Sequence, residues 1–154
     1  MRKRDFLISV AIPLFTGVFA SLLTGGGMAS FSTMTTPPLT PPAWVFPVAW
    51  TALYTMMGMA AYLVTITEQE GVDRALLWYG AQLTVNFFWS ILFFGLQWYL
   101  AAFVWLVFLW WLILGTIRAF GKISKKAAWL LLPYLLWVTF AGYLNLGVWW
   151  LSRQ

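Results

Sequence analysis

The sequence contains no cysteine and no histidine, and only four of its 154 residues are acidic. Without cysteine no disulfide forms, and without either residue the chain has no common ligand set for zinc, copper or an iron–sulfur cluster. A catalytic triad is excluded for the same reason. We therefore expect no metal site and no cofactor.

Charge is also scarce. Charged residues make up 8% of the chain and hydrophobic residues 62%, whereas about 25% of a water-soluble domain is charged. All nine basic and four acidic residues lie outside five apolar stretches, at 6–23, 43–67, 75–94, 99–117 and 127–151. A bilayer core of about 30 Å needs about 20 helical residues, so each stretch is long enough to cross it once.

The apolar stretches favour helices over a transmembrane barrel. Residues Trp105 to Leu114 are continuously apolar and do not alternate with the period of two that a barrel strand shows. Helices satisfy their own backbone groups in hydrocarbon. We predict an all-α integral membrane protein, a single domain over residues 1–154 built as a five-helix bundle, with residues 24–42 as a capping loop. The basic start and first apolar run also resemble a secretory signal, but the run exceeds the usual ~7 to 15 residues, so we count it as a span.

The distribution of basic residues predicts the orientation. If the spans alternate, eight of the nine basic residues share one side of the membrane and Arg153 lies alone on the other. The eight are Arg2, Lys3, Arg4, Arg74, Arg118, Lys122, Lys125 and Lys126. The positive-inside rule then places the N-terminus in the cytoplasm and the C-terminus outside the cell membrane. Orientation and contact with anionic lipid headgroups account for the lysines at 122–126, so we expect no nucleic-acid partner.

Several aromatic and polar side chains lie deep inside the spans. No Asp, Glu, Lys or Arg interrupts a span, which argues against ion-coupled transport. Trp50, Trp89 and Trp137 lie too far inside to be interfacial belt residues, and a buried indole N–H needs either an interhelical partner or a polar ligand atom. Gln82 and Asn86 lie on one helix face, where interhelical bonding and ligand contact both remain open.

Three sequence blocks carry a family resemblance. The first runs from Pro41 to Tyr54 and reads PPAWVFPVAWTALY. The second is NFFWS at 86–90 followed by FFG at 93–95, and the third is PYLLW at 133–137 followed by FA at 140–141 and LN at 144–145. In these blocks, in length and in span number, the chain resembles the TspO/MBR family of translocator proteins, also called tryptophan-rich sensory proteins and peripheral-type benzodiazepine receptors.

The resemblance implies a usually dimeric bundle with a ligand pocket under the first connection. Its ligands would be flat apolar molecules, above all porphyrins such as protoporphyrin IX. The implied lining comprises Phe31, Pro41, Phe46, Trp50, Tyr54, Asn86, Trp89, Trp137, Ala141 and Leu144. Trp50 and Asn86 would be the polar contacts. Four functions stay open. The first is a sensor that regulates tetrapyrrole or stress responses, and the second is a light- and oxygen-dependent porphyrin-degrading enzyme with Trp50 and Trp137 as candidate catalytic residues. The third is a facilitator of transport of apolar ligands, and the fourth is a structural scaffold, which needs no pocket.

The chain departs from the family pattern at three places. Leu39 stands where the family usually has Trp, so we expect a weaker grip of the loop on a ligand. Phe31 stands where Tyr is frequent, which removes a hydroxyl. The proposed sterol motif needs a Tyr shortly before a basic residue, and Tyr143 is too far from Arg153 to form it. Sterol binding is therefore not expected.

Overall fold

The computed structural model describes residues 3–24 and 36–153. In chain order its elements are α1 (Lys3–Thr24), α3 (Val45–Thr65), α4 (Val72–Ser90), the π-helix η1 (Ile91–Gly95), α5 (Tyr99–Gly121) and α6 (Lys125–Ser152). Five helical stretches are long and apolar enough to cross a membrane, the third being α4 together with η1. The prediction of an all-α chain with five spans is confirmed.

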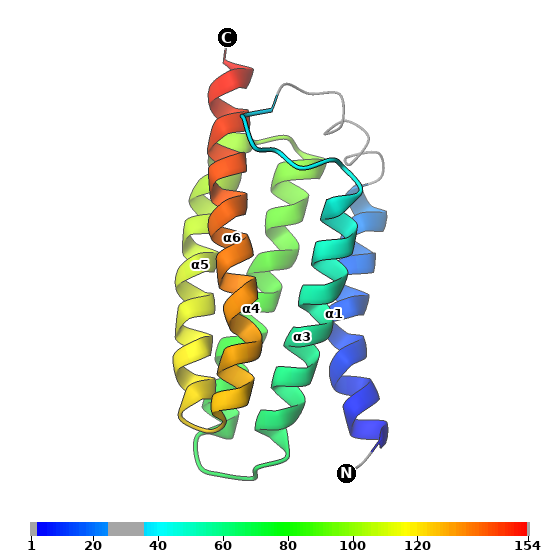
Figure 1. Ribbon diagram of the computed structural model, residues 1–154, viewed down its shortest axis with the longest axis vertical. Coiled ribbons are helices and arrows are strands. Elements are labelled where there is room, and N and C mark those ends of the chain that lie inside the picture. The colour runs from blue at the N-terminus through cyan, green and yellow to red at the C-terminus, as the bar shows by residue number, and fades with distance from the viewer. Residues whose placement is uncertain (1–2, 25–35, 154) are drawn as a thin grey trace.

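The five long helices run side by side along the long axis of the molecule, and the two ends of the chain lie at opposite ends of the bundle (Figure 1). Neighbouring helices follow the order α1, α3, α6, α5, α4 and back to α1. The order in space therefore differs from the order in sequence. It leaves α3, α4 and α6 facing one another around the interior.

Two glycines allow α1 to approach α3 closely. A Cβ added at Gly58 of α3 would lie 2.4 Å from the Cα atom of Val10, and one added at Gly17 of α1 would lie 2.4 Å from the ring of Tyr54. Small residues permit such close backbone approach in membranes, where helix association depends on van der Waals packing. Gly17 thus serves packing within this chain.

Four of the five spans extend beyond their apolar stretches at the end where most charges lie, whereas α3 (Val45–Thr65) is shorter than the predicted stretch 43–67. Helix α4 begins at Val72, so Asp73 and Arg74 belong to its first turn, and α6 begins at Lys125. Ser124 caps α6, since its side chain accepts a hydrogen bond from the backbone N–H of Ala127 at 3.3 Å. Apolarity marks only the part of a helix inside hydrocarbon, whereas the helix continues into the polar interface.

The sequence did not predict the π-helix at the end of the third span. The N–H of Leu96 donates to the carbonyl of Ile91 at 2.8 Å, five residues back. The wider turn changes the direction of the side chains. As a result Phe93 stacks on Trp89 with ring centres 5.4 Å apart, and Phe94 meets the same indole edge-on at 6.0 Å.

The second half of the first connection lies against α6 (Figure 1). Pro37 is buried and fills the space beside Gly147, where an added Cβ would lie 2.5 Å from its ring. The hydroxyl of Tyr143 donates to the carbonyl of Pro38 at 2.6 Å. Leu39 is 84% exposed and points away from the bundle interior. The predicted ligand contact Phe31 lies outside the described residues.

Candidate functional site

Side chains at helical spacing on three helices form an aromatic pocket in the bundle. On α3, Phe46 and Trp50 are four residues apart, and on α6, Trp137 and Ala141 repeat this spacing. Residues four apart lie on one helix face. The pocket is lined by Phe46, Trp50, Trp89, Phe93, Phe94, Trp137, Ala141, Leu144 and Asn145. The structure thus brings together six of the ten residues that the family resemblance implied.

Trp50 lies at the centre of this ring cluster. Its ring centre is 6.1 Å from that of Trp89 and 6.4 Å from that of Trp137. The indole planes of Trp50 and Trp137 are nearly perpendicular. Tyr54 stacks on it at 5.5 Å. Such edge-to-face and stacked arrangements are each worth about 0.5–1.5 kcal/mol beyond simple burial. The rings therefore fill the pocket by contacting one another.

The side chains that line the aromatic pocket fill almost all of it. Its volume is about 20 Å³, which is near the lower limit for a single water molecule. Pockets for drug-sized ligands measure about 300–1,000 Å³. A flat aromatic ligand therefore enters only if some of the rings move.

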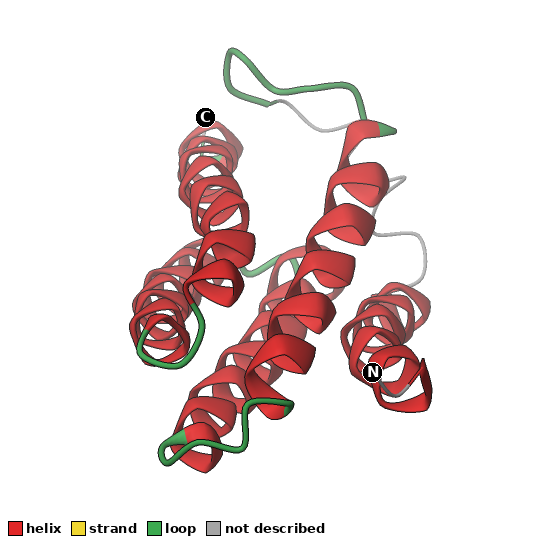
Figure 2. Ribbon diagram, turned by 60° about the horizontal axis from the view of Figure 1, so that its bottom comes forward, coloured by secondary structure: helices red, strands yellow, loops and turns green. Residues whose placement is uncertain are grey.

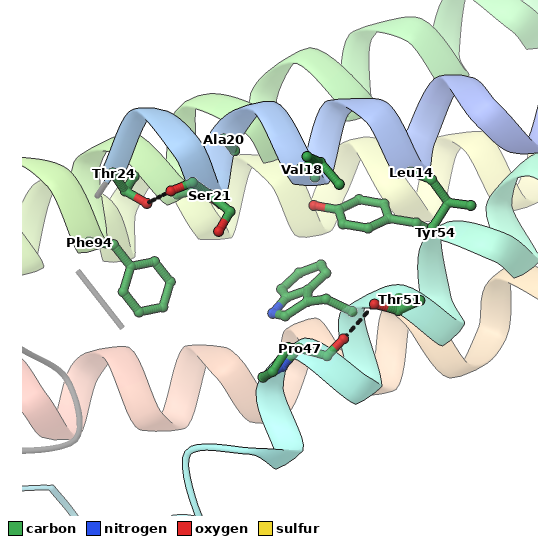
Figure 3. A pocket seen from close by; sticks show the side chains of 12 residues that line it. Leu14, Val18, Ala20, Ser21, Thr24, Pro47, Thr51, Tyr54 and Phe94 are labelled. Carbon is green, nitrogen blue, oxygen red and sulfur yellow. Dashed lines mark hydrogen bonds between the residues drawn. The ribbon is translucent and has the colours of Figure 1, made fainter. Parts of the chain in front are cut away.

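A larger side cavity of about 260 Å³ lies between α1, α3 and the end of the third span (Figure 3). From α1 it is lined by Leu14, Gly17, Val18, Ala20, Ser21 and Thr24, from α3 by Pro47, Trp50, Thr51 and Tyr54, and from the third span by Ser90 and Phe94. Figure 3 shows Ser21 and Thr24 on one side of the space and Thr51 and Tyr54 on the other. Sequence reasoning missed the contribution of α1, for which the only signal was the spacing of Gly17 and Ser21.

Two side chains separate the side cavity from the aromatic pocket. Trp50 and Phe94 line both spaces. A movement of these two rings would join the spaces into one. The Thr51 hydroxyl donates to the carbonyl of Pro47 in its own helix at 2.7 Å, so it offers the cavity an acceptor oxygen and no free donor.

The interior indoles differ in how their N–H groups are satisfied. The Trp89 N–H donates to Oδ1 of Asn145 at 3.1 Å, and Nδ2 of Asn145 donates to the carbonyl of Tyr99 at 2.8 Å. This arrangement joins α4, α6 and α5. By contrast the buried N–H of Trp137 has no hydrogen-bond partner among the described residues. A buried donor without a partner costs about 1–3 kcal/mol, and a ligand acceptor would relieve that cost.

Asn86 lies in a second polar network that links α3, α4 and α6 and borders the side cavity only through Tyr54. The Tyr54 hydroxyl donates to Oδ1 of Asn86 at 2.8 Å, and Nδ2 of Asn86 donates to the Tyr134 hydroxyl at 2.7 Å. The Tyr134 hydroxyl donates in turn to Oε1 of Gln82 at 2.7 Å. Asn86 is 0% exposed and lines neither space. This geometry favours interhelical bonding over ligand contact for Asn86.

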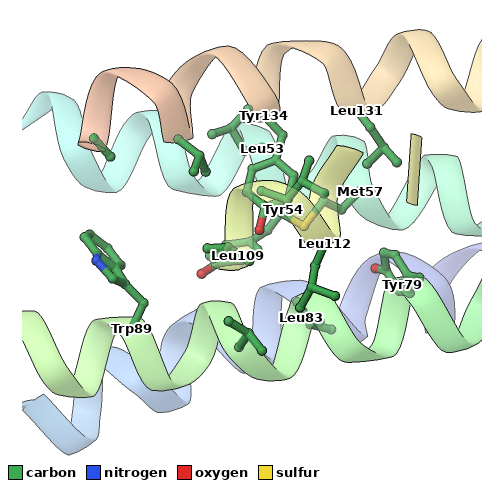
Figure 4. Close-up of a cluster of buried hydrophobic side chains, with 14 of the residues drawn as sticks. Leu53, Tyr54, Met57, Tyr79, Leu83, Trp89, Leu109, Leu112, Leu131 and Tyr134 are labelled. Atoms are coloured by element: carbon green, nitrogen blue, oxygen red, sulfur yellow. The ribbon is translucent and has the colours of Figure 1, made fainter. Parts of the chain in front are cut away.

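Apolar side chains pack against the buried part of this network. Figure 4 shows Tyr54 and Tyr134 among Leu53, Met57 and Leu109 in the buried cluster. In such surroundings each hydroxyl depends on its partners in the other helices. Of the remaining predicted contacts, Tyr54 lines the side cavity, while Pro41 is half-buried in the first connection and lines neither space.

The lining limits the chemistry that the two spaces support. Neither space is lined by an Asp, Glu, Lys or Arg. Acid–base catalysis by these groups is therefore not available in the described part of the site. What remains is stacking on flat apolar molecules, a hydrogen bond from the Trp137 N–H to a carbonyl or carboxylate, hydrogen bonds with hydroxyls of the side cavity such as those of Ser21 and Ser90, and electron donation by the indoles.

Comparisons with known proteins identify the family that the three sequence blocks resemble. The model of the TspO/MBR family matches residues 9–151. The tryptophan-rich protein TspO of Chlorobaculum tepidum is 42% identical over 120 residues, which cover 77% of this chain and 76% of that protein. TspO of Archaeoglobus fulgidus is 36% identical over 153 residues and 99% of both chains. The translocator protein of Homo sapiens is 33% identical over 149 residues, 94% of this chain and 86% of its own length.

Proposed function

Because the chain belongs to the TspO/MBR family, we propose that this multi-pass membrane protein is a receptor or sensor for porphyrin-like tetrapyrroles such as protoporphyrin IX. Binding would regulate tetrapyrrole or stress responses. The ligand would occupy the aromatic pocket and the side cavity together. The protein would act as a homodimer in the lipid bilayer, with its N-terminus in the cytoplasm.

The unpartnered N–H of Trp137 carries this proposal. It is a buried donor in a pocket walled by rings, by aliphatic side chains and by Asn145, whose amide already bonds to Trp89 and to the backbone of Tyr99. A tetrapyrrole offers the matching chemistry, because it is flat, apolar and carries carboxylates at its edge. Its face would stack on Trp50 and Trp89, while a carboxylate oxygen would accept the hydrogen bond from Trp137.

Binding requires the two spaces to merge. Trp50 and Phe94 separate them, and ring contacts of about 0.5–1.5 kcal/mol each are small enough for a ligand to replace. A ligand entering the side cavity would displace these rings and reach Trp137. The coupling of ring movement to occupancy would supply the signal of a sensor.

Titration with protoporphyrin IX tests the proposal. Tryptophan fluorescence of the purified protein should be quenched saturably, and Trp137→Phe should weaken binding roughly threefold to tenfold, as expected for one lost hydrogen bond. Trp150→Phe is the matched control, since Trp150 is 57% exposed and lines neither space. Quenching that does not saturate, or equal weakening in both variants, would refute a specific site.

The proximity of two indoles favours one alternative, a light- and oxygen-dependent porphyrin-degrading activity. Trp50 and Trp137 lie 6.4 Å apart between ring centres, and indoles donate electrons far more readily than phenyl rings. Under illumination, Trp50→Phe and Trp137→Phe should slow the loss of the porphyrin Soret band sharply, while Trp150→Phe should not. Degradation no faster than in empty detergent would leave the sensor proposal standing alone. Facilitated passage of apolar ligands would need no ionisable side chain either, and flux into vesicles would test it.

A further inference from the structure

A third cavity lies at the end of the bundle where the basic residues gather. Figure 2 turns this end of the bundle toward the viewer. It is formed by the start of α4 and the last turns of α5 and has a volume of about 530 Å³. Its lining includes Arg74, Arg118, Lys122, Trp78, Trp111 and Gly115. It shares no residue with the aromatic pocket or the side cavity, so a ligand here would be a different one.

The rim of this cavity carries unpaired positive charge. Arg74, Arg118 and Lys122 are all exposed and border the cavity, and Glu70 is its one acidic lining residue. None of the three basic side chains forms an ion pair with a carboxylate in the described part of the chain. Three cations against one anion around a concave surface attract an anionic group.

The floor of the cavity is aromatic and is shaped by a glycine. The rings of Trp78 and Trp111 meet edge-on with centres 5.4 Å apart. A Cβ added at Gly115 would lie 2.4 Å from the Trp78 ring, so the glycine lets this indole lie directly on the backbone of α5. Trp111 is 55% exposed toward the lipid side of the bundle. The cavity therefore combines a cationic rim with an apolar floor that continues onto the membrane-facing surface.

We propose that this cavity binds the phosphate headgroup of an anionic phospholipid. Arg74 and Arg118 donate to the phosphate oxygens, for which the planar guanidinium is suited because it donates two parallel hydrogen bonds. Lys122 adds a third positive charge. The first part of an acyl chain packs against Trp111, which a free phosphate ion could not do.

General attraction of basic residues to an anionic membrane would also retain such a lipid, and the chain offers a control for it. Lys125 and Lys126 lie at the same end of the bundle and are exposed, but they do not line the cavity. The variants Arg74→Gln/Arg118→Gln and Lys125→Gln/Lys126→Gln each remove two positive charges. Only the first pair changes the cavity.

Native mass spectrometry of the purified protein with phosphatidylglycerol and phosphatidylcholine tests the proposal. The parent protein should retain one phosphatidylglycerol in preference to phosphatidylcholine. The arginine pair should lower that retention roughly tenfold to thirtyfold, which matches the usual contribution of two basic residues that contact an anionic headgroup. The lysine pair does not line the cavity and should lower retention by less than about threefold. Equal loss in both pairs, or no preference for phosphatidylglycerol in the parent, would overturn the proposal.

Two further measurements distinguish lipid binding in the cavity from binding of a soluble phosphate and from attraction by surface charge alone. Glycerol 3-phosphate at millimolar concentration should not displace the lipid; displacement would show a site for soluble phosphates and overturn the proposal. Gly115→Ala keeps every charge and pushes Trp78 out of the floor, so retention of phosphatidylglycerol should fall. Retention at the parent level in this variant, with an unchanged circular dichroism spectrum, would show that surface charge alone holds the lipid and would also overturn the proposal.

Discussion

Removal of the Asn86 amide tests whether the buried network stabilises the bundle. In Asn86→Ala the Tyr54 hydroxyl loses its acceptor and the Tyr134 hydroxyl loses a donor. Tyr134 keeps its bond to Gln82, so the damage falls mainly on Tyr54. We expect a loss of stability with little change in ligand affinity, because Asn86 lines neither ligand space.

The size of the loss follows from the bonds removed. Interhelical hydrogen bonds in membranes average about 0.6 kcal/mol and reach about 1.7 kcal/mol, and two are lost. Leaving the Tyr54 hydroxyl buried without an acceptor adds about 1 kcal/mol or more. The total is about 2–3 kcal/mol. For a chain of this length that corresponds to a fall in midpoint temperature of roughly 5–10 °C.

Thermal unfolding in detergent, followed by circular dichroism, measures the effect. Tyr54→Phe removes only one bond of the network and should cost about half as much. Thr84→Ala is the control on the same helix, because the Thr84 hydroxyl is exposed and bonds only to the carbonyl of Gly80 at 2.8 Å. It should shift the free energy of unfolding by less than about 0.5 kcal/mol.

The opposite result would refute this reasoning. If Asn86→Ala unfolds at the parent temperature but binds protoporphyrin IX roughly tenfold more weakly, Asn86 contacts the ligand and the network rearranges on binding. Equal destabilisation by Asn86→Ala and Thr84→Ala would also refute it, because the buried bonds would then contribute no more than a lipid-facing hydroxyl.

Three further predictions concern packing and orientation. Gly58→Ala should lower the free energy of unfolding, measured by thermal unfolding, by about 1–3 kcal/mol, since the new methyl meets the backbone of α1. Gly80→Ala is the control, because an added Cβ there has nothing within 4 Å. It should leave the free energy of unfolding unchanged or raise it by up to about 1 kcal/mol. Gly147→Ala should push Pro37 off α6 and speed porphyrin association in stopped-flow fluorescence quenching. Gly142→Ala on the same helix should not, because its added Cβ would make an ordinary contact at 3.6 Å. Equal association rates in both variants would argue against the first connection acting as a cap over the ligand site. A tag at the N-terminus should be protected from external protease in intact cells and one at the C-terminus should be cleaved, and the reverse result would refute the orientation inferred from charge.

The spans could be predicted from sequence because hydrophobicity and charge are properties of local composition. Burial in hydrocarbon requires about 20 apolar residues wherever they occur, so neither the partners of a helix nor its position in the bundle had to be known. The grouping of Phe46 with Trp50, and of Trp137 with Ala141, came from the family resemblance, and the spacing of four residues agrees with one helix face in each case. These features depend on one helix at a time.

Features that depend on two helices could not be predicted in this way. Whether Asn86 bonds to Tyr54 or to a ligand depends on how far α3 is shifted along α4, and the sequence does not contain that offset. The same holds for the N–H of Trp89, which reaches Asn145 56 positions away. The π-helix escaped prediction because its one extra residue per turn leaves no mark in composition, although it decides that Phe94 borders both spaces.

The hydrogen bonds of the indoles divide the aromatic pocket into a fixed and a movable half. Trp89 is held by Asn145, which is itself held by the backbone of α5, so displacing Trp89 would break its buried hydrogen bond to α6. Trp50 makes only ring contacts among the described residues. A ligand that stacks on the aromatic pocket replaces ring contacts with similar ring contacts, but it offers no substitute for a broken bond between helices. Under the proposed function, an entering ligand would therefore displace Trp50 from the side cavity, while Trp89 would stay in place as the surface on which the ligand stacks.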